Sequence, residues 1–172
     1  KEQDVIYHQL GLVLEPVKNW VTHIDFNYKI DNRIRHWDSQ RTYNHNVAGD
    51  PIIYNQNSNV HEDEYKDNYL NFQAYSEYSW SLAARHNFHI MAGFQAEQLK
   101  RTEFGLQRDG ILDPFKPEVD LTSGLSYDGK AVVPSTNGAR NQWQTAGFFG
   151  RLNYNYNERY LAEVNLRYDG TS

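Results

Sequence analysis

The chain contains no cysteine, one methionine and five prolines among its 172 residues. Without cysteine it can form no disulfide and no thiolate metal site. No apolar run approaches the roughly 20 residues of a transmembrane helix, so only a β-barrel arrangement would carry this chain across a membrane. The net charge of −5 argues against a nucleic-acid partner, which selects for clustered basic residues. The absence of a charged-then-apolar leader predicts a mature or internal segment.

Recognisable catalytic and metal-binding motifs are also missing. There is no H-E-x-x-H, no G-x-S-x-G and no glycine loop that would cradle phosphate. His86 and His89 are expected on different sides of a turn and an emerging strand, which favours a structural role. The acidic run Glu62–Glu64 offers carboxylates to calcium, but it lacks the D-x-D-x-D-G spacing, and a solvated loop is the better interpretation. We therefore predict no enzyme, no cofactor and no metal site, and assign no residue to ligand binding.

What the chain does contain is clearest in Phe148–Ser172. Two runs of alternating apolar and polar residues flank the short polar connector Asn157–Arg159, which predicts a β-hairpin. The apolar face has aromatic residues at both ends: Tyr154, Tyr156 and Tyr160 near the turn and Tyr168 at the far end. The polar face carries Arg151, Asn153, Glu163, Asn165 and Arg167. Aromatic residues at both ends of an apolar band are typical of a membrane-spanning barrel, although a soluble antiparallel sheet shows the same alternation.

The same alternation predicts six strands in all, over residues 5–14, 20–30, 69–82, 88–101, 143–156 and 160–168. Short turns are expected at Glu15–Asn19, where Pro16 would end the ladder, at Ala83–Asn87 and at Asn157–Arg159. Long polar connections are expected at Asp31–Asn68 and Thr102–Gln142. Alternating short and long connections are typical of outer-membrane barrels. We therefore predict an all-β fold, an antiparallel up-and-down meander forming part of the wall of a large transmembrane β-barrel. Six strands are too few to close a barrel, which predicts a fragment.

The run GRLNYNYNERYLAEVNLRYDGTS closely resembles a late barrel hairpin of SusC/RagA-like TonB-dependent transporters. The matching positions are Gly150, Arg151, Tyr154, Tyr156, Arg159, Tyr160, Leu161, Arg167, Asp169, Gly170, Thr171 and Ser172. The resemblance implies part of a barrel of about 22 strands in the Gram-negative outer membrane, surrounded by its lipid. It also implies a SusD-like surface lipoprotein as partner, energy from the TonB complex, and oligosaccharides or peptides as cargo. The plug domain of such transporters is not expected in this segment.

On this interpretation the polar face of the last hairpin would line a watery lumen. Residues of the long connections, such as Phe115, Tyr127 and Asn137, would contact the lipoprotein lid or the incoming ligand. The alternative function is a soluble β-sandwich module that binds carbohydrate through loop aromatics. A barrel enzyme of the outer-membrane protease or lipase kind ranks third, because no catalytic set is present.

Overall fold

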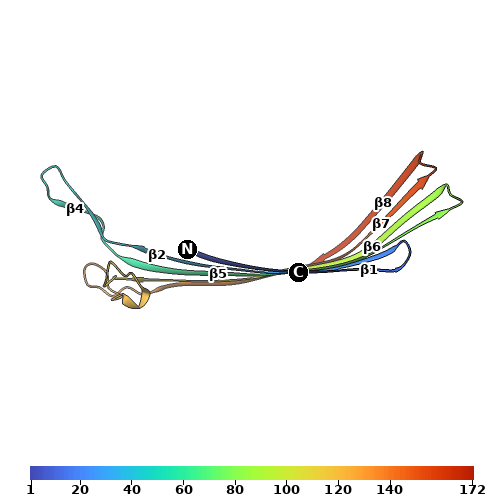
Figure 1. Cartoon of the computed structure of the whole chain (residues 1–172). Helices are drawn as coiled ribbons and strands as arrows, with labels where there is room; N and C mark the ends of the chain where they lie inside the picture. Colours follow the sequence, from blue (N-terminus) through green and yellow to red (C-terminus); the bar gives the residue numbers. More distant parts are fainter. The chain divides into compact units, whose positions relative to one another are not determined.

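The computed structural model describes residues 1–172, about three quarters of them in β-strands. The elements in chain order are β1 (Glu2–Val17), β2 (Trp20–Ser39), β3 (Thr42–His45), β4 (Pro51–Asn55), β5 (Asn59–Leu82), β6 (His86–Asp109), the 3-10 helix η1 (Val119–Leu121), β7 (Ser135–Tyr156) and β8 (Tyr160–Thr171). Six strands form one sheet in the order β1-β2-β5-β6-β7-β8, and β3 and β4 form a separate sheet of two. The predicted antiparallel up-and-down meander is confirmed (Figure 1).

The last hairpin shows how alternation becomes structure. β7 and β8 pair antiparallel, with Tyr156 opposite Tyr160 and Leu152 opposite Val164. The three-residue turn is closed by the Arg159 backbone N–H, which donates to the Tyr156 carbonyl at 3.0 Å. The Asn155 side chain accepts the Glu158 backbone N–H at 2.9 Å, and this bond holds the turn residues in place. Phe148, Leu152, Tyr154 and Tyr156 of β7 therefore face apolar or aromatic residues of β8 on one side of the sheet, whereas Phe149 faces Arg167 on the other.

All six strands of the large sheet are longer than the sequence pattern predicts, and four of them extend well beyond it. β2 continues to Ser39, β5 begins at Asn59, β6 continues to Asp109 and β7 begins at Ser135. Polar side chains occupy both faces in these extensions, so the apolar alternation disappears while the backbone ladder continues. The expected long connections Asp31–Asn68 and Thr102–Gln142 were therefore wrong in extent. The structure has instead residues 40–58, which contain the β3–β4 hairpin, and residues 110–134, which contain η1.

Two short turns are also tighter than expected. The first contains Lys18 and Asn19 alone, because β1 runs through Pro16 to Val17. Pro16 lies one residue before the end of β1, next to the turn. Asn19 has φ of 68°, a left-handed conformation that asparagine adopts more readily than most residues. The second turn is residues 83–85, since β6 begins at His86.

The chain divides into two compact units, and each strand of the large sheet except β8 contributes to both. Unit 1 comprises Lys1–Asp4, Asp31–Lys66 and Arg101–Arg140, and unit 2 comprises Val5–Ile30, Asp67–Lys100 and Asn141–Ser172. All three short turns belong to unit 2, where the Asn157 N–H donates to the Arg85 carbonyl at 2.7 Å. Both long connections belong to unit 1, where the Gly110 N–H donates to the Ser58 carbonyl at 2.7 Å. Connections of like length therefore contact one another.

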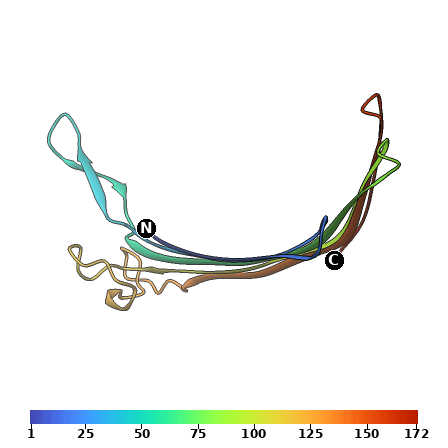
Figure 2. The same cartoon turned by 45° about the vertical axis from the view of Figure 1, so that its right-hand side comes forward.

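The large sheet has almost no apolar core. Val60 is the only hydrophobic residue whose side chain is buried, whereas Leu10 and Leu166 are 69% and 73% exposed. Within unit 2 the strands form one layer in both views, with no second sheet against either face (Figures 1 and 2). A β-sandwich buries the inner faces of two packed sheets, so the absence of such a core is at odds with the sandwich alternative. No helix in the structure has the length and apolar character needed to cross a membrane.

Candidate functional site

A row of aromatic rings crosses one face of unit 2 beside the short turns. Its members are Trp20, Tyr78, Trp80, Phe88, Tyr154, Tyr156 and Tyr160. Ring centroids lie 5.6 Å apart for Tyr78 and Trp80, and 4.9 Å apart for Trp80 and Phe88. His86 joins the row, since its Nδ1 lies 2.7 Å from the Tyr154 hydroxyl. Trp and Tyr combine an apolar ring with a polar group, so such a row suits a boundary between an apolar phase and water.

The same face stays apolar away from the turns. Phe94 lies between Phe72 and Phe148, with ring centroids 6.4 Å and 5.1 Å away. Between these rings and the aromatic row lie aliphatic side chains of β7 and β8, including Leu152 and Val164, which are 41% and 54% exposed. A contiguous apolar surface of this kind marks contact with another apolar phase or a partner.

The opposite face of unit 2 carries a chain of polar side chains across five strands. It runs through Tyr7, Asn27, Asn71, Glu97, Gln95, Arg167 and Asp169. The Asn71 amide donates to Glu97 at 3.2 Å, and Gln95 donates to the same carboxylate oxygen at 2.7 Å. Arg167 of β8 reaches over β7 to Gln95 of β6, at 3.4 Å. Gly147 leaves room on β7, because a Cβ there would overlap the Asp169 carboxylate.

The five polar residues predicted to share a face do so. The Arg151 Nε donates to Asn165 at 2.9 Å, and the Asn165 amide donates to Glu163 at 2.6 Å. In the β7–β8 register, Asn153 lies opposite Glu163 and Arg167 lies opposite Phe149. Arg151, Asn165 and Glu163 are therefore linked by hydrogen bonds rather than being separate charges.

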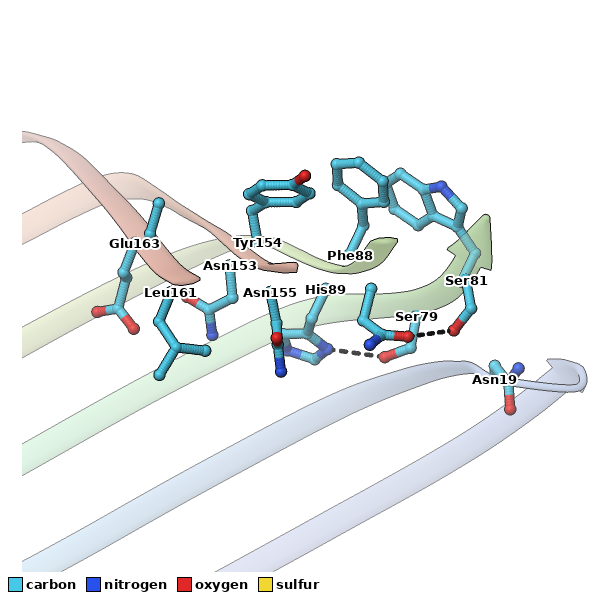
Figure 3. Close-up of a pocket in the computed structure, with 13 residues that line it drawn as sticks. Asn19, Ser79, Ser81, Phe88, His89, Asn153, Tyr154, Asn155, Leu161 and Glu163 are labelled. Atoms are coloured by element: carbon cyan, nitrogen blue, oxygen red, sulfur yellow. Dashed lines mark hydrogen bonds between the residues drawn. The ribbon is translucent and has the colours of Figure 1, made fainter. Parts of the chain in front are cut away.

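Near the short turns this polar face is hollowed by a recess of about 570 Å³. Its lining includes Ser79, Asn87, His89, Asn153 and Glu163 (Figure 3). His89 Nδ1 lies 2.9 Å from the Ser79 hydroxyl. The Asn153 Oδ1 is buried and has no hydrogen-bond partner, so it is a free acceptor in the recess wall. Hydroxyl, amide and imidazole groups in such a recess can bind the polar groups of a ligand.

Figure 3 also shows which side chains lie on each face of the sheet. Phe88 and Tyr154 point to one side of the sheet, whereas His89, Asn155 and Glu163 point to the other (Figure 3). His86 contacts Tyr154 on the aromatic side. The expectation that His86 and His89 lie on different sides is therefore correct, and the two imidazoles cannot share one metal ion.

In unit 1 the two long connections, residues 40–58 and 110–134, are joined by hydrogen bonds. The Gln40 amide donates to the Pro114 carbonyl at 2.8 Å, and the Tyr127 N–H donates to Asn57 Oδ1 at 3.2 Å. A cavity of about 390 Å³ lies between them. Phe115 is 99% exposed and Tyr127 is 49% exposed, so both are available to a partner. Asn137 is different from the prediction, because it lies in β7 rather than in a connection.

Unit 1 also contains a cluster that the sequence did not predict. His36 of β2, Glu62 of β5 and Glu118, just before η1, place their potential ligand atoms within 4.8 Å of one another. His36 Nδ1 lies 2.5 Å from Glu62 Oε1. This hydrogen bond raises the pKa of His36 above its usual value, and the nearby negative charges of Glu118 and Asp38 add to the effect. Glu62–Glu64 belong to a strand, so the predicted solvated loop was wrong.

An aromatic stack connects β2 and β5, the two strands that carry His36 and Glu62. The rings of Trp37 and His61, each next in sequence to a member of the cluster, stack with centroids 3.5 Å apart and an interplanar angle of 6°. Burial lowers the pKa of His61 below its usual value, which favours the neutral ring. The alternation along β2 indicates the position of His36. It lies an even number of residues from Ile24 and Ile30, so its side chain is on the same face of the strand. No sequence signal places Glu118 beside that face.

The sequence matches no protein-family model and no curated protein. Solved structures resemble the fold. The structure of the RagAB peptide transporter aligns with a TM-score of 0.77 and 16% identity, over 98% of this chain and 18% of that chain. The RagAB peptide importer in its "closed-closed" state aligns with a TM-score of 0.73 and 16% identity, over 99% and 18%. The chain thus spans less than a fifth of the length of these structures, and at this identity the likeness concerns the fold alone. Its structural neighbours are transporter chains, and what it shares with them is their β fold.

Proposed function

We propose that this chain is a wall segment of an outer-membrane β-barrel transporter of the SusC/RagA kind. The observation that carries the proposal is the contrast between the two faces of unit 2. One face is apolar and bordered by the aromatic row, and the other carries hydrogen-bonding groups across five strands. Neither face covers a core. A barrel wall needs this combination, because lipid contacts its outer face and water fills its interior.

The strand lengths support the same proposal. β5 and β6 contain 24 residues each, more than twice the roughly 9–11 residues that a strand needs to cross a bilayer. Only part of each strand is needed within the membrane. The part that belongs to unit 2 carries the apolar face and would be the membrane-spanning part. The polar extensions in unit 1 would then stand in water outside the bilayer, with the two long connections at the extracellular surface. The short turns would face the periplasm, as in bacterial barrels generally.

The cargo in this proposal is an oligosaccharide or a peptide, imported with energy from the TonB complex through parts of the protein outside this segment. The solved neighbours are described as a peptide transporter and a peptide importer, which supports peptides as one of the two classes. A SusD-like surface lipoprotein would cover the extracellular end. Phe115 supports a contact role for residues 110–134, because a phenylalanine that is 99% exposed has no partner of its own in this chain.

Shortening the second connection tests this function. In the full-length protein, residues 111–133 would be replaced by a short Asn-Gly turn. This turn would join the adjacent strands β6 and β7 directly. We expect normal amounts of folded protein in the outer membrane, and cargo uptake and lipoprotein capture reduced at least several-fold. Uptake of labelled oligosaccharides and peptides measures the first effect, and co-purification of the lipoprotein measures the second.

A point variant refines the test. Phe115→Ser should lower lipoprotein capture without affecting insertion, since the side chain makes almost no contact within the chain. Lys116→Ser, at the neighbouring exposed position, is the matched control and should behave like the unmodified protein. If the shortened protein is inserted normally and both capture and uptake are unchanged, this role for the connection is wrong.

A further inference from the structure

The cluster of His36, Glu62 and Glu118 brings together one imidazole and two carboxylates from three separate segments of unit 1. Their potential ligand atoms all lie within 4.8 Å of one another. Zinc bonds to such ligands are about 2.0–2.2 Å long, so donor atoms around one ion lie about 3–4 Å apart. The 2.5 Å hydrogen bond between His36 Nδ1 and Glu62 Oε1 would open slightly to admit the ion, and small side-chain rotations would bring the Glu118 carboxylate into range. His36 and Glu118 are exposed and Glu62 is half-buried, which leaves room for water at the remaining coordination positions.

The backbone around Glu118 supports a role for its carboxylate away from its own helix. Glu118 occupies the N-cap position of η1, yet its side chain makes no capping hydrogen bond. The Leu121 N–H donates to the Glu118 backbone carbonyl at 3.0 Å, which is the first hydrogen bond of the turn, so the carboxylate has no part in the turn itself. The carboxylate therefore extends toward β2 and β5 rather than satisfying the local turn.

The donor set indicates which class of ion would fit. Calcium and magnesium prefer oxygen ligands throughout, and calcium needs 6–8 of them. An imidazole nitrogen with two carboxylates suits first-row transition ions, and two-nitrogen–one-carboxylate and related mixed sets bind Zn²⁺ and Fe²⁺ in proteins. With no cysteine in the chain, these nitrogen and oxygen donors are the ligands available.

We propose that His36, Glu62 and Glu118 form a binding site for a divalent transition-metal ion, such as Zn²⁺, that fastens the 110–134 connection to β2 and β5. The Trp37–His61 stack holds the two strands in register on the other face, so two of the three ligands are already positioned. Glu118 supplies the ligand from the connection. Binding of the ion would restrict the segment around η1 without changing the sheet.

Zinc titration of the full-length protein, purified in detergent and stripped of metal with a chelator, tests this site. Isothermal titration calorimetry should detect a site that is weakened at least about tenfold by Glu118→Gln and by His36→Ala. Both residues are exposed, so neither change should affect folding. Glu64→Gln is the matched control, because Glu64 is an exposed carboxylate two positions from Glu62 on the same strand. Its affinity for Zn²⁺ should equal that of the unmodified protein.

Hydrogen exchange supplies a second measurement that reports on the connection itself. Zn²⁺ should slow amide exchange around residues 116–122 in the unmodified protein and in Glu64→Gln, but not in Glu118→Gln. Equal affinity in the unmodified protein, Glu118→Gln and His36→Ala would show that zinc binds elsewhere and would overturn the proposal. An equal loss in Glu64→Gln would also overturn it, because the effect would then come from general negative charge.

Discussion

Leu152→Arg is expected to destabilise the folded barrel by about 2–4 kcal/mol, the cost of placing a charge in lipid near the bilayer midplane. Leu152 is on the apolar face of β7, opposite Val164, and is 41% exposed in this chain. In sequence Leu152 is midway between Phe148 and Tyr156, and Tyr156 belongs to the aromatic row. The arginine would therefore meet the most apolar part of the bilayer. Denaturant unfolding of the full-length protein in lipid vesicles, followed by tryptophan fluorescence, measures the effect.

The opposite face provides two controls for this substitution. Asn153→Arg, one position further on, should destabilise the protein much less than Leu152→Arg, because residue 153 lies on the polar face opposite Glu163. Leu161→Arg makes the same chemical change as Leu152→Arg at a residue that also lines the recess, and it too should be tolerated. Equal damage from Leu152→Arg and Leu161→Arg would contradict the assignment of the two faces.

Gly93→Ala is the second change expected to have a large effect, a loss of about 1–3 kcal/mol from overpacking. Gly93 of β6 lies beneath two aromatic side chains on the polar face, Tyr75 of β5 and Phe149 of β7, whose ring centroids are 6.5 Å apart. A Cβ at Gly93 would lie 2.6 Å from the Tyr75 Cβ and 2.5 Å from the Phe149 Cζ. The Phe149 ring can rotate away, but the Tyr75 Cβ moves only with its strand.

Gly150→Ala is the matched control on the neighbouring strand. A Cβ at Gly150 would meet only the Met91 carbonyl oxygen, at 3.4 Å, which is ordinary contact. Alanine also restricts the unfolded chain more than glycine, so this variant should be neutral or slightly more stable. The two variants would be compared by their denaturant midpoints in the same vesicles. A Gly93→Ala protein as stable as Gly150→Ala would show that the rings do not confine this position.

The sequence predicted the fold best where the two faces differ in polarity. In Phe148–Tyr168 the alternation identified both strands, the Asn157–Arg159 turn and the residues on each face. The sequence did not predict strands whose two faces are both polar, as in Asp31–Ser39. Such a strand is held by backbone hydrogen bonds to neighbouring strands, and these bonds do not depend on which side chains are present. Residue-level alternation is a signal of different surroundings on the two sides of a strand, rather than of the strand itself.

Alternation along single strands also determines which parts of the candidate site are predictable from sequence. Arg151, Asn153 and Glu163 were predicted on one face because they alternate with apolar neighbours. The link from Arg167 to Gln95 was not predictable, since it depends on the sheet order and on the space above Gly147. Glu118 likewise approaches His36 only through the path of the 110–134 connection. Long-range partners of this kind depend on tertiary structure, and spacing along the chain does not reveal them.

In the proposed barrel wall β7 has lipid on one side and water on the other, and cysteine accessibility along Phe148–Tyr156 tests this arrangement most directly. Because the chain has no cysteine of its own, single cysteines can be placed at each position of this segment in a cysteine-free full-length protein. The protein would be reconstituted in vesicles and treated with a small, charged, membrane-impermeant thiol reagent. Cysteines at residues 149, 151, 153 and 155 should react, and those at 148, 150, 152, 154 and 156 should stay protected until the protein is unfolded. Uniform reactivity, or protection of both sets, would contradict a barrel wall with one lipid face and one aqueous face.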